Sequence, residues 1–352
     1  MGELQYYHSL SEKDSVFTTR RIDTEAEFDD FFIYATEQTG CYWRGVAQAK
    51  FKFYSSLQRY WISNDKPNDV NAVEEYLKLQ RKKILEWRGG IIPRYLKVAM
   101  NERYPSIFSL LSIMRHYEVP TPCTDWTTDP SVALYFMSDS KSTVEEIEID
   151  QYSSIYLLDR DHPWVHFDIK SNLLTDSEMK SIKKIFRSFP DQKFESAKKL
   201  GIEIEDLSDE WLMKKKFCES VALGYAANHD GVALRIEDKP GDVFSWGISN
   251  NLNLISQKGL FLYHVEPNAP LEEFPSRLIE NYARRQGSLS SLKSLEQREI
   301  RAKEVLKGVL CYNINNKLHS YIRNKVGEAP WYINATNLFP DLNKLAEELF
   351  LD

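Results

Sequence analysis

Apolar residues recur at helical spacing along much of the chain, and this pattern predicts most of its helices. In the stretch 26–38, for example, Phe28, Phe31 and Phe32 fall on one face of a helix. By the same reasoning, helices are expected over residues 73–87, 106–117, 176–228, 291–312, 314–322 and after Pro340.

Shorter apolar and aromatic runs predict strands. These runs lie at residues 41–47, 154–159, 232–236 and 260–265. They do not alternate regularly with the expected helices, which argues against a doubly wound parallel sheet, and their presence excludes an all-helical protein. The order therefore favours an α+β fold, a small mixed or antiparallel sheet with extensive helical insertions.

Length and charge narrow the class of protein. The chain has 352 residues and a formal net charge of −7, with no obvious basic patch, so nucleic-acid binding is disfavoured. No apolar run reaches the roughly 18–20 residues that span a bilayer, and the first residues lack the apolar core of a secretory signal. The four cysteines show no metal-ligand spacing. We therefore expect a cytoplasmic protein with reduced thiols, no membrane segment and no metal.

The densest group of polar and aromatic residues lies between His116 and Phe136, where the chain reads HYEVPTPCTDWTTDPSVALYF. A His-Tyr pair is followed by a turn bracketed by prolines, and then by the expected end of a strand at Asp-Trp-Thr-Thr. A helix is expected to begin at Pro130, because Asp129 can cap it and proline fits the first helical position.

This stretch resembles the central signature of the FRG-domain family of bacterial and phage proteins, in which HYGLPTRLLDWT is followed by a proline and VALYFA. The family is named for a Phe/Tyr-Arg-Gly motif, which YWRG at 42–45 matches loosely. Three further segments resemble family landmarks, at 55–59, 251–261 and 338–346. The resemblance implies a single FRG-like domain.

The expected domain covers residues 1–352. Its core is expected at about 40–275 and contains a helical insertion at about 176–228. A helical C-terminal part is expected at about 276–352.

The chain departs from the family pattern at several positions. The family glycine after His-Tyr is replaced by Glu118, and the family arginine that follows the Pro-Thr pair is replaced by Pro122. Cys123 and Thr124 stand where the family has leucines, and Asn253 replaces a late arginine. The loss of two basic residues that bind phosphate implies altered or weakened ligand binding.

A weaker resemblance, in the order of features rather than in motif identity, is to the ADP-ribosyltransferases. One branch of that superfamily has an Arg-Gly pair at a strand end, then a Ser-Thr-Ser strand and an apolar helix. A Glu or Gln on a late strand acts on the nicotinamide ribose. Arg44-Gly45, residues 125–136 and Gln257 appear here in the same order. The resemblance implies an ADP-ribosyltransferase-like core and NAD as the substrate.

Cleavage of the nicotinamide glycosidic bond builds positive charge on the ribose, so the site must hold a pyrophosphate and stabilise an oxocarbenium-like state. The resemblance assigns Arg44 and Gly45 to the cofactor phosphates and Thr127 to the ribose. Aromatic rings expected to stack on nicotinamide or adenine are those of Tyr42, Tyr117 and Trp126.

The candidate catalytic residues are Gln257, Asp125 and His116. A glutamine lacks the negative charge that would stabilise the oxocarbenium ion, so Asp125 or Glu118 would have to supply it.

Each candidate also has a structural interpretation. Arg44 can pair with a carboxylate near the core, Asp125 can bond amides in the turn, and His116 can bond a carbonyl at a helix end. Thr127 can cap the following helix, and the amide of Gln257 can cap a strand edge. The functional interpretation therefore requires Arg44, Asp125, Thr127 and Gln257 to line one cleft.

The leading hypothesis is an NAD-binding ADP-ribosyltransferase-like effector that transfers ADP-ribose to a macromolecule or hydrolyses NAD. The occurrence of such families implies a toxin or antiphage-defence role; the sequence does not name the acceptor. The alternative is a non-catalytic module that binds a nucleotide or a partner protein in the same cleft, which the missing arginines favour.

Overall fold

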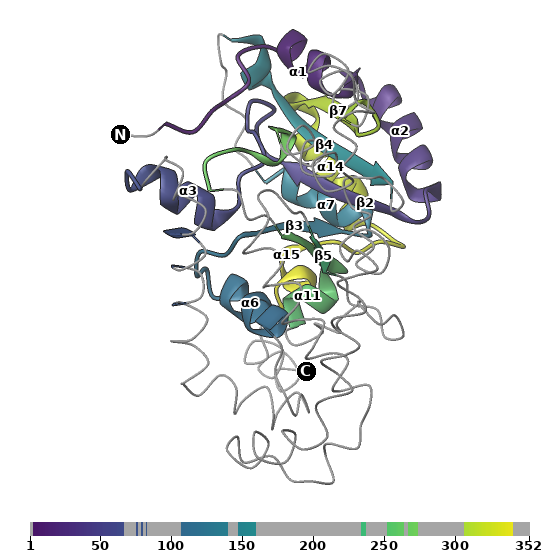
Figure 1. The fold of residues 1–352 in the computed structure, drawn as a ribbon. Helices are drawn as coiled ribbons and strands as arrows, with labels where there is room; N and C mark the ends of the chain where they lie inside the picture. The colour runs from purple at the N-terminus through teal and green to yellow at the C-terminus, as the bar shows by residue number, and fades with distance from the viewer. Residues whose placement is uncertain are drawn as a thin grey trace, which may run out of the picture.

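Seven strands form one sheet, in the order β1-β7-β4-β2-β3-β6-β5 (Figure 1). The computed structural model describes residues 3–66, 75, 76, 79, 82, 107–139, 147–159, 234–236, 252–263, 267–273 and 306–340. The strands are β1 (Thr18–Ile22), β2 (Cys41–Val46), β3 (Cys123–Thr127), β4 (Tyr152–Asp159), β5 (Leu234–Ile236), β6 (Gly259–Tyr263) and β7 (Leu310–Asn315).

Helices cover the sheet and close its ends. The α-helices of the described residues are α1 (Leu10–Val16), α2 (Glu25–Glu37), α3 (Ser56–Ser63), α6 (Ile107–His116), α7 (Pro130–Met137), α11 (Leu252–Ser256), α14 (His319–Gly327) and α15 (Ala335–Leu338). Short 3-10 turns are found at η1 (Glu148–Gln151), η3 (Leu271–Glu273) and η5 (Asn316–Leu318). Among these described helices, none has the length and apolar character that would cross a membrane.

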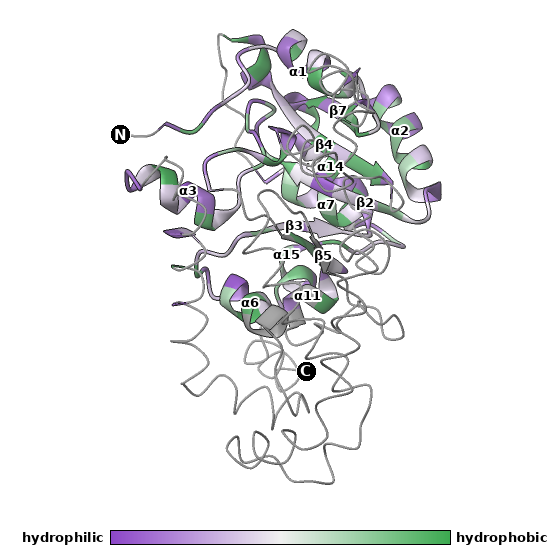
Figure 2. Cartoon of the chain, in the orientation of Figure 1, coloured by the Kyte–Doolittle hydropathy of each residue, from purple (hydrophilic) through white to green (hydrophobic). Residues whose placement is uncertain are grey.

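The sheet is mixed, which confirms the α+β class. Strand β1 runs parallel to β7, and the other neighbours are antiparallel. Both faces are buried, as two successive residues of β2 show. Tyr42 packs with α1 and Phe53 on one face, and Trp43 packs with α2, α7 and α14 on the other. The helices on this second face present one apolar side each, and Figure 2 shows apolar and polar segments alternating along α2.

The sheet is almost divided between β2 and β3. These two strands share a single residue pair, Trp43 with Thr127, whereas β2 and β4 share six pairs and β3 and β6 share five. Beyond that pair, β2 continues to Val46 while β3 extends back to Cys123 without further pairing between them. The backbone groups that face this gap need partners other than a strand ladder.

The start of α7 follows from its sequence. Asp129 is the N-cap residue and its Oδ1 accepts a hydrogen bond from the backbone N of Ser131 at 2.9 Å. Pro130 occupies the first helical position, where the missing N–H costs nothing. This confirms the helix expected to begin at Pro130.

The structure confirms the helices expected over 26–38 and 106–117, which are α2 and α6, and the strand expected at 154–159, which is β4. The strands expected at 41–47 and 260–265 are β2 and β6, with ends shifted by one or two residues. The expectations for 176–228 and for the helix after Pro340 lie outside the described residues, as does nearly all of 73–87.

The prediction that the helix at 291–312 continues to its end was wrong, since Leu310–Asn315 forms β7. This strand lies between β1 and β4, and its successive residues Cys311 and Tyr312 are buried in the cores on opposite faces of the sheet. A strand buried on both faces lacks the apolar–polar alternation of a half-exposed strand, so the period alone does not distinguish it from a buried helix. The sheet therefore extends into the part of the chain that was expected to be helical.

Gly45 allows α7 to lie directly against β2. A Cβ atom at this position would stand 1.9 Å from the carbonyl oxygen of Ala133 and 2.9 Å from the backbone N of Met137. Because both atoms belong to the helix backbone, no side-chain rotation can relieve the overlap. The glycine after Arg44 is therefore required by packing.

We expect Gly45→Ala to destabilise the protein by about 1–3 kcal/mol or more, because α7 must move away from the sheet. Denaturant unfolding followed by circular dichroism measures this. The matched control is Gly327→Ala at the end of α14, where the new Cβ meets its nearest atom at 3.8 Å. Equal stability losses in the two variants would contradict the packing role of Gly45.

Candidate functional site

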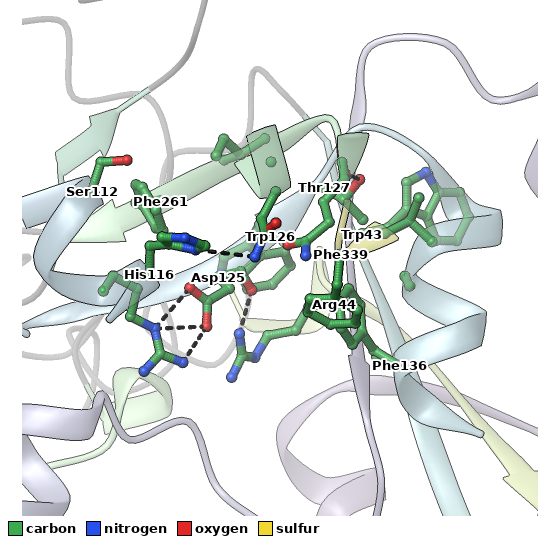
Figure 3. Close-up of a pocket in the computed structure, with 18 of the residues that line it drawn as sticks. Trp43, Arg44, Ser112, His116, Asp125, Trp126, Thr127, Phe136, Phe261 and Phe339 are labelled. Atoms are coloured by element: carbon green, nitrogen blue, oxygen red, sulfur yellow. Dashed lines mark hydrogen bonds and ion pairs between the residues drawn. The ribbon is translucent and has the colours of Figure 1, made fainter. Parts of the chain in front are cut away.

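A pocket of about 550 Å³ opens at the division between β2 and β3. Figure 3 shows side chains from several elements converging on it. Of the residues proposed from the sequence, the pocket lining includes Arg44, Gly45, His116, Asp125, Trp126, Thr127 and Gln257. The structure therefore brings together the four residues whose common location the functional interpretation required.

Arg44 reaches across the division. It lies one residue beyond the Trp43–Thr127 pair, and its Nη1 donates a hydrogen bond to the carbonyl oxygen of Asp125 in β3 (Figure 3). The guanidinium thus satisfies a backbone acceptor that the interrupted ladder leaves open.

The remaining donors of Arg44 are only partly used. Its Nε is buried without a hydrogen-bond partner, and no carboxylate of the described residues lies within ion-pair distance of it. Burial lowers the pKa of Arg44 to about 10, so the group is still charged at neutral pH. Asp125 acts on Arg44 at longer range, but no carboxylate of the described residues pairs with Arg44 directly, which leaves its donors open to an anionic ligand.

Asp125 is held by Arg115, a residue that the sequence did not single out. Arg115 Nε donates to Oδ1 at 3.0 Å and to Oδ2 at 3.2 Å, and Nη2 donates to Oδ2 at 2.6 Å. This two-pronged pair fixes the carboxylate at the pocket wall and neutralises it. Pro122 removes a guanidinium from the expected family position, but Arg115 in the last turn of α6 supplies one to the same pocket.

Positive charge exceeds negative charge around Asp125. Burial raises the pKa of its carboxyl, but Arg115 above all, with Arg44 and Arg59, outweighs burial and holds the pKa below its ordinary value. Arg59 projects from α3, and burial together with the Arg115 charge lowers its pKa. Three guanidinium groups therefore act on one carboxylate, an arrangement suited to binding an anion.

Thr127 and Gln257 hold the pocket wall together. The Thr127 hydroxyl donates to the carbonyl oxygen of Gln257 at 2.7 Å and accepts from the backbone N of Asp129 at 3.0 Å. The expected capping role belongs to Asp129, and the Thr127 hydroxyl supports it by bonding the backbone N of that residue. Gln257 donates from Nε2 to the carbonyl oxygen of Leu338 at 3.1 Å. The analogy placed the glutamine on a strand; it lies instead in the turn between α11 and β6.

His116 is the last residue of α6, and its ring lies at the pocket. Its Nδ1 accepts a hydrogen bond from Nδ2 of Asn253 at 3.0 Å, which leaves the proton of the neutral ring on Nε2. Burial lowers the pKa of His116. Asn253, which stands where the family has a late arginine, therefore orients this imidazole.

The aromatic residues proposed for stacking take different positions from those expected. Tyr42 is buried in the core beneath the continuous part of the sheet, and Tyr117 is 62% exposed at the helix end; neither lines the pocket as described. The Trp126 ring is 3% exposed and packs on Phe53, so it forms wall rather than a free surface.

Other rings line the pocket instead. Phe136 of α7 and Phe339, which follows α15, have ring centroids 5.9 Å apart at its edge. Phe339 is exposed, and neither residue was proposed from the sequence. Their separation in the chain gives no signal of this contact before the fold is known.

The fold and site define a class: an α+β protein with a pocket at a division in its sheet, lined by two arginines and two carboxylates. Residues 39–146 match the family model of the FRG domain, so this part of the chain is an FRG domain. The match spans β2, α3, α6, β3 and α7, and of these β2, α6, β3 and α7 carry most of the pocket lining. No curated protein and no solved structure was found to match the chain.

We expect Asp125→Asn to lower the free energy of unfolding by about 1–2 kcal/mol at pH 7, because charge-assisted bonds to Arg115 become neutral ones. A carboxyl whose pKa is depressed by folding stabilises the fold above its ordinary pKa of about 3.9, and this contribution is lost as pH falls through the folded pKa. The difference between wild type and variant should therefore shrink below about pH 4. Denaturant titrations at pH 7 and pH 3 measure it.

Glu148→Gln is the control, since its carboxylate pairs with Arg21 at the exposed surface, and a cost below about 1 kcal/mol is expected. A cost of Asp125→Asn that stays constant with pH would show that the ion pair is not its source.

Proposed function

We propose that the pocket at the β2–β3 division binds NAD⁺ and that the protein acts as an ADP-ribosyltransferase-like effector, transferring ADP-ribose or hydrolysing NAD⁺. The observation that carries the proposal is the excess of guanidinium groups around Asp125, with Arg44 lacking a carboxylate partner among the described residues. Guanidinium groups suit the oxygens of a pyrophosphate.

The chemistry assigns a role to each part of the pocket. Arg44 and Arg115 line the pocket and would hold the pyrophosphate, with the charge of Arg59 acting from outside the lining. Phe136 and Phe339 offer rings for a base. In the reaction, the bond between ribose C1′ and the nicotinamide nitrogen breaks and its electron pair leaves with nicotinamide. Water or an acceptor nucleophile then adds at C1′ and loses a proton.

Few side-chain groups of the pocket are open to bond the ribose. Gln257 lies in the pocket with one amide N–H donated to the Leu338 carbonyl, so its side-chain oxygen and its second N–H are left to bond a ribose hydroxyl. The Thr127 hydroxyl already has two backbone partners. Thr127 is therefore not proposed to bind the ribose, and a group whose hydrogen-bonding capacity is still open has to do so.

A specific observation favours a second candidate, binding of a nucleotide without turnover. The Asp125 carboxylate is neutralised by Arg115, and Gln257 carries no charge. An oxocarbenium ion that formed beside these two groups would gain little electrostatic stabilisation. In this case the pocket would serve as a ligand-responsive module.

Purified protein incubated with NAD⁺ is expected to release nicotinamide, with or without cell extract as a source of acceptor, as measured by liquid chromatography. Arg59→Ala should weaken NAD⁺ binding in calorimetry by about tenfold, because a positive charge that acts on the phosphates from outside the lining is lost. Arg44→Ala should abolish binding, and its melting temperature shows how much of that loss comes from the interstrand bond.

Arg21→Ala is the matched control, since it removes the same charge from β1, an edge strand that β7 and β4 separate from β2. Binding without nicotinamide release would select the second candidate. If wild-type protein does not bind NAD⁺ at all, both candidates fail for this ligand.

A further inference from the structure

We propose that the Glu118 carboxylate accepts hydrogen bonds from the ribose hydroxyls of the ligand in this pocket. This role rests on the proposed function. Glu118 lines the same pocket as Arg44 and Asp125. It follows the end of α6, in the turn that leads to β3. Three features of Glu118 support this role: its backbone conformation, its lack of a side-chain partner among the described residues, and the polarity that it gives the pocket.

The backbone at Glu118 adopts a conformation that favours glycine. Its φ is +59°, in the left-handed region. The backbone N of Val119 bonds to the Met114 carbonyl, and that of Glu118 bonds to the Arg115 carbonyl, at 2.9 and 3.1 Å. This is the Schellman end of a helix, in which the left-handed residue is usually glycine. A glutamate here costs stability, and such costs persist at functional sites.

The Glu118 carboxylate is available to a ligand. The side chain is exposed, and among the described residues no hydrogen bond or ion pair engages it. Asp125, the other carboxylate of the pocket lining, accepts three close contacts from Arg115. Glu118 is therefore the acidic group of this pocket with open acceptor capacity.

With Glu118, the pocket presents two kinds of binding group, cationic donors and a free carboxylate acceptor. Two guanidinium groups, those of Arg44 and Arg115, line the pocket together with the carboxylates of Asp125 and Glu118, and Glu118 acts on Arg115. A ligand that satisfies both kinds of group has an anionic part for the guanidinium groups and a part rich in hydroxyl donors for the free carboxylate. A ribose joined to a pyrophosphate has both parts, whereas inorganic pyrophosphate has only the first.

The test compares these two ligands by calorimetry on the full chain. Glu118→Gln should weaken NAD⁺ binding by about tenfold, because a charged acceptor of hydroxyl bonds is replaced by a neutral one. The same variant should bind inorganic pyrophosphate as tightly as wild type or more tightly, because a negative charge is removed. A residue with only a structural role would not separate the two ligands.

A second variant uses the strained backbone. Glu118→Gly should raise the melting temperature by about 2 °C while weakening NAD⁺ binding at least as much as Glu118→Gln. The matched control is Asp65→Gly. Asp65 is an acidic residue with φ +49°, and it has the same position in the same type of helix end after α3, but it does not line the pocket. Its replacement should raise the melting temperature and leave NAD⁺ binding unchanged.

The outcomes separate the two proposals. Wild-type binding of NAD⁺ with equal affinity in Glu118→Gln overturns the role of Glu118 and leaves the proposed function standing. Equal weakening for NAD⁺ and pyrophosphate overturns it too, because the loss is then one of pocket structure. Failure of the wild type to bind NAD⁺ removes the proposed function and, with it, this role.

Discussion

The hydrogen bond from Arg44 to the Asp125 carbonyl is the interaction on which the pocket depends. Strands β2 and β3 pair at one position only, and past it the guanidinium takes the place of the missing ladder. A strand pair that stayed closed would leave no room for a ligand, and one with no bridge would leave buried backbone groups unsatisfied. The arginine stabilises the division and puts a positive charge inside it.

Gly45, the residue after Arg44, supports the same pocket by allowing α7 to pack directly against β2. The α7 backbone lies so close to Gly45 that no side chain fits between them. That helix begins directly after β3, with Asp129 as its cap, so its position fixes the strand that carries Asp125. The Arg-Gly pair of an FRG domain thus has a physical meaning here: one residue bridges the division, and the next brings the helix and sheet into contact.

Local signals in the sequence predict much of the fold around the pocket and several of the residues that line it. The Asp129-Pro130 start of α7 follows from capping rules, and the convergence of Arg44, Asp125 and Gln257 was expected from the resemblance. Arg115 was not foreseen, because a cation in the last turn of a helix is explained by the helix dipole alone. Strand β7 was missed because its burial on both faces removes the alternation that identifies strands. The pairing of β7 depends on distant parts of the chain, whereas Arg115 lies ten residues from Asp125 and meets it only because the turn after α6 brings β3 back beside the helix.

The central claim is that the division between β2 and β3 is a site for a pyrophosphate-containing nucleotide. The most direct measurement is a crystal structure of the full chain with NAD⁺ bound. The account predicts pyrophosphate oxygens within hydrogen-bond distance of the Arg44 guanidinium, in the pocket that Asp125 and Gln257 line. Nucleotide bound elsewhere, with Arg44 still bonded only to the Asp125 carbonyl, would contradict it.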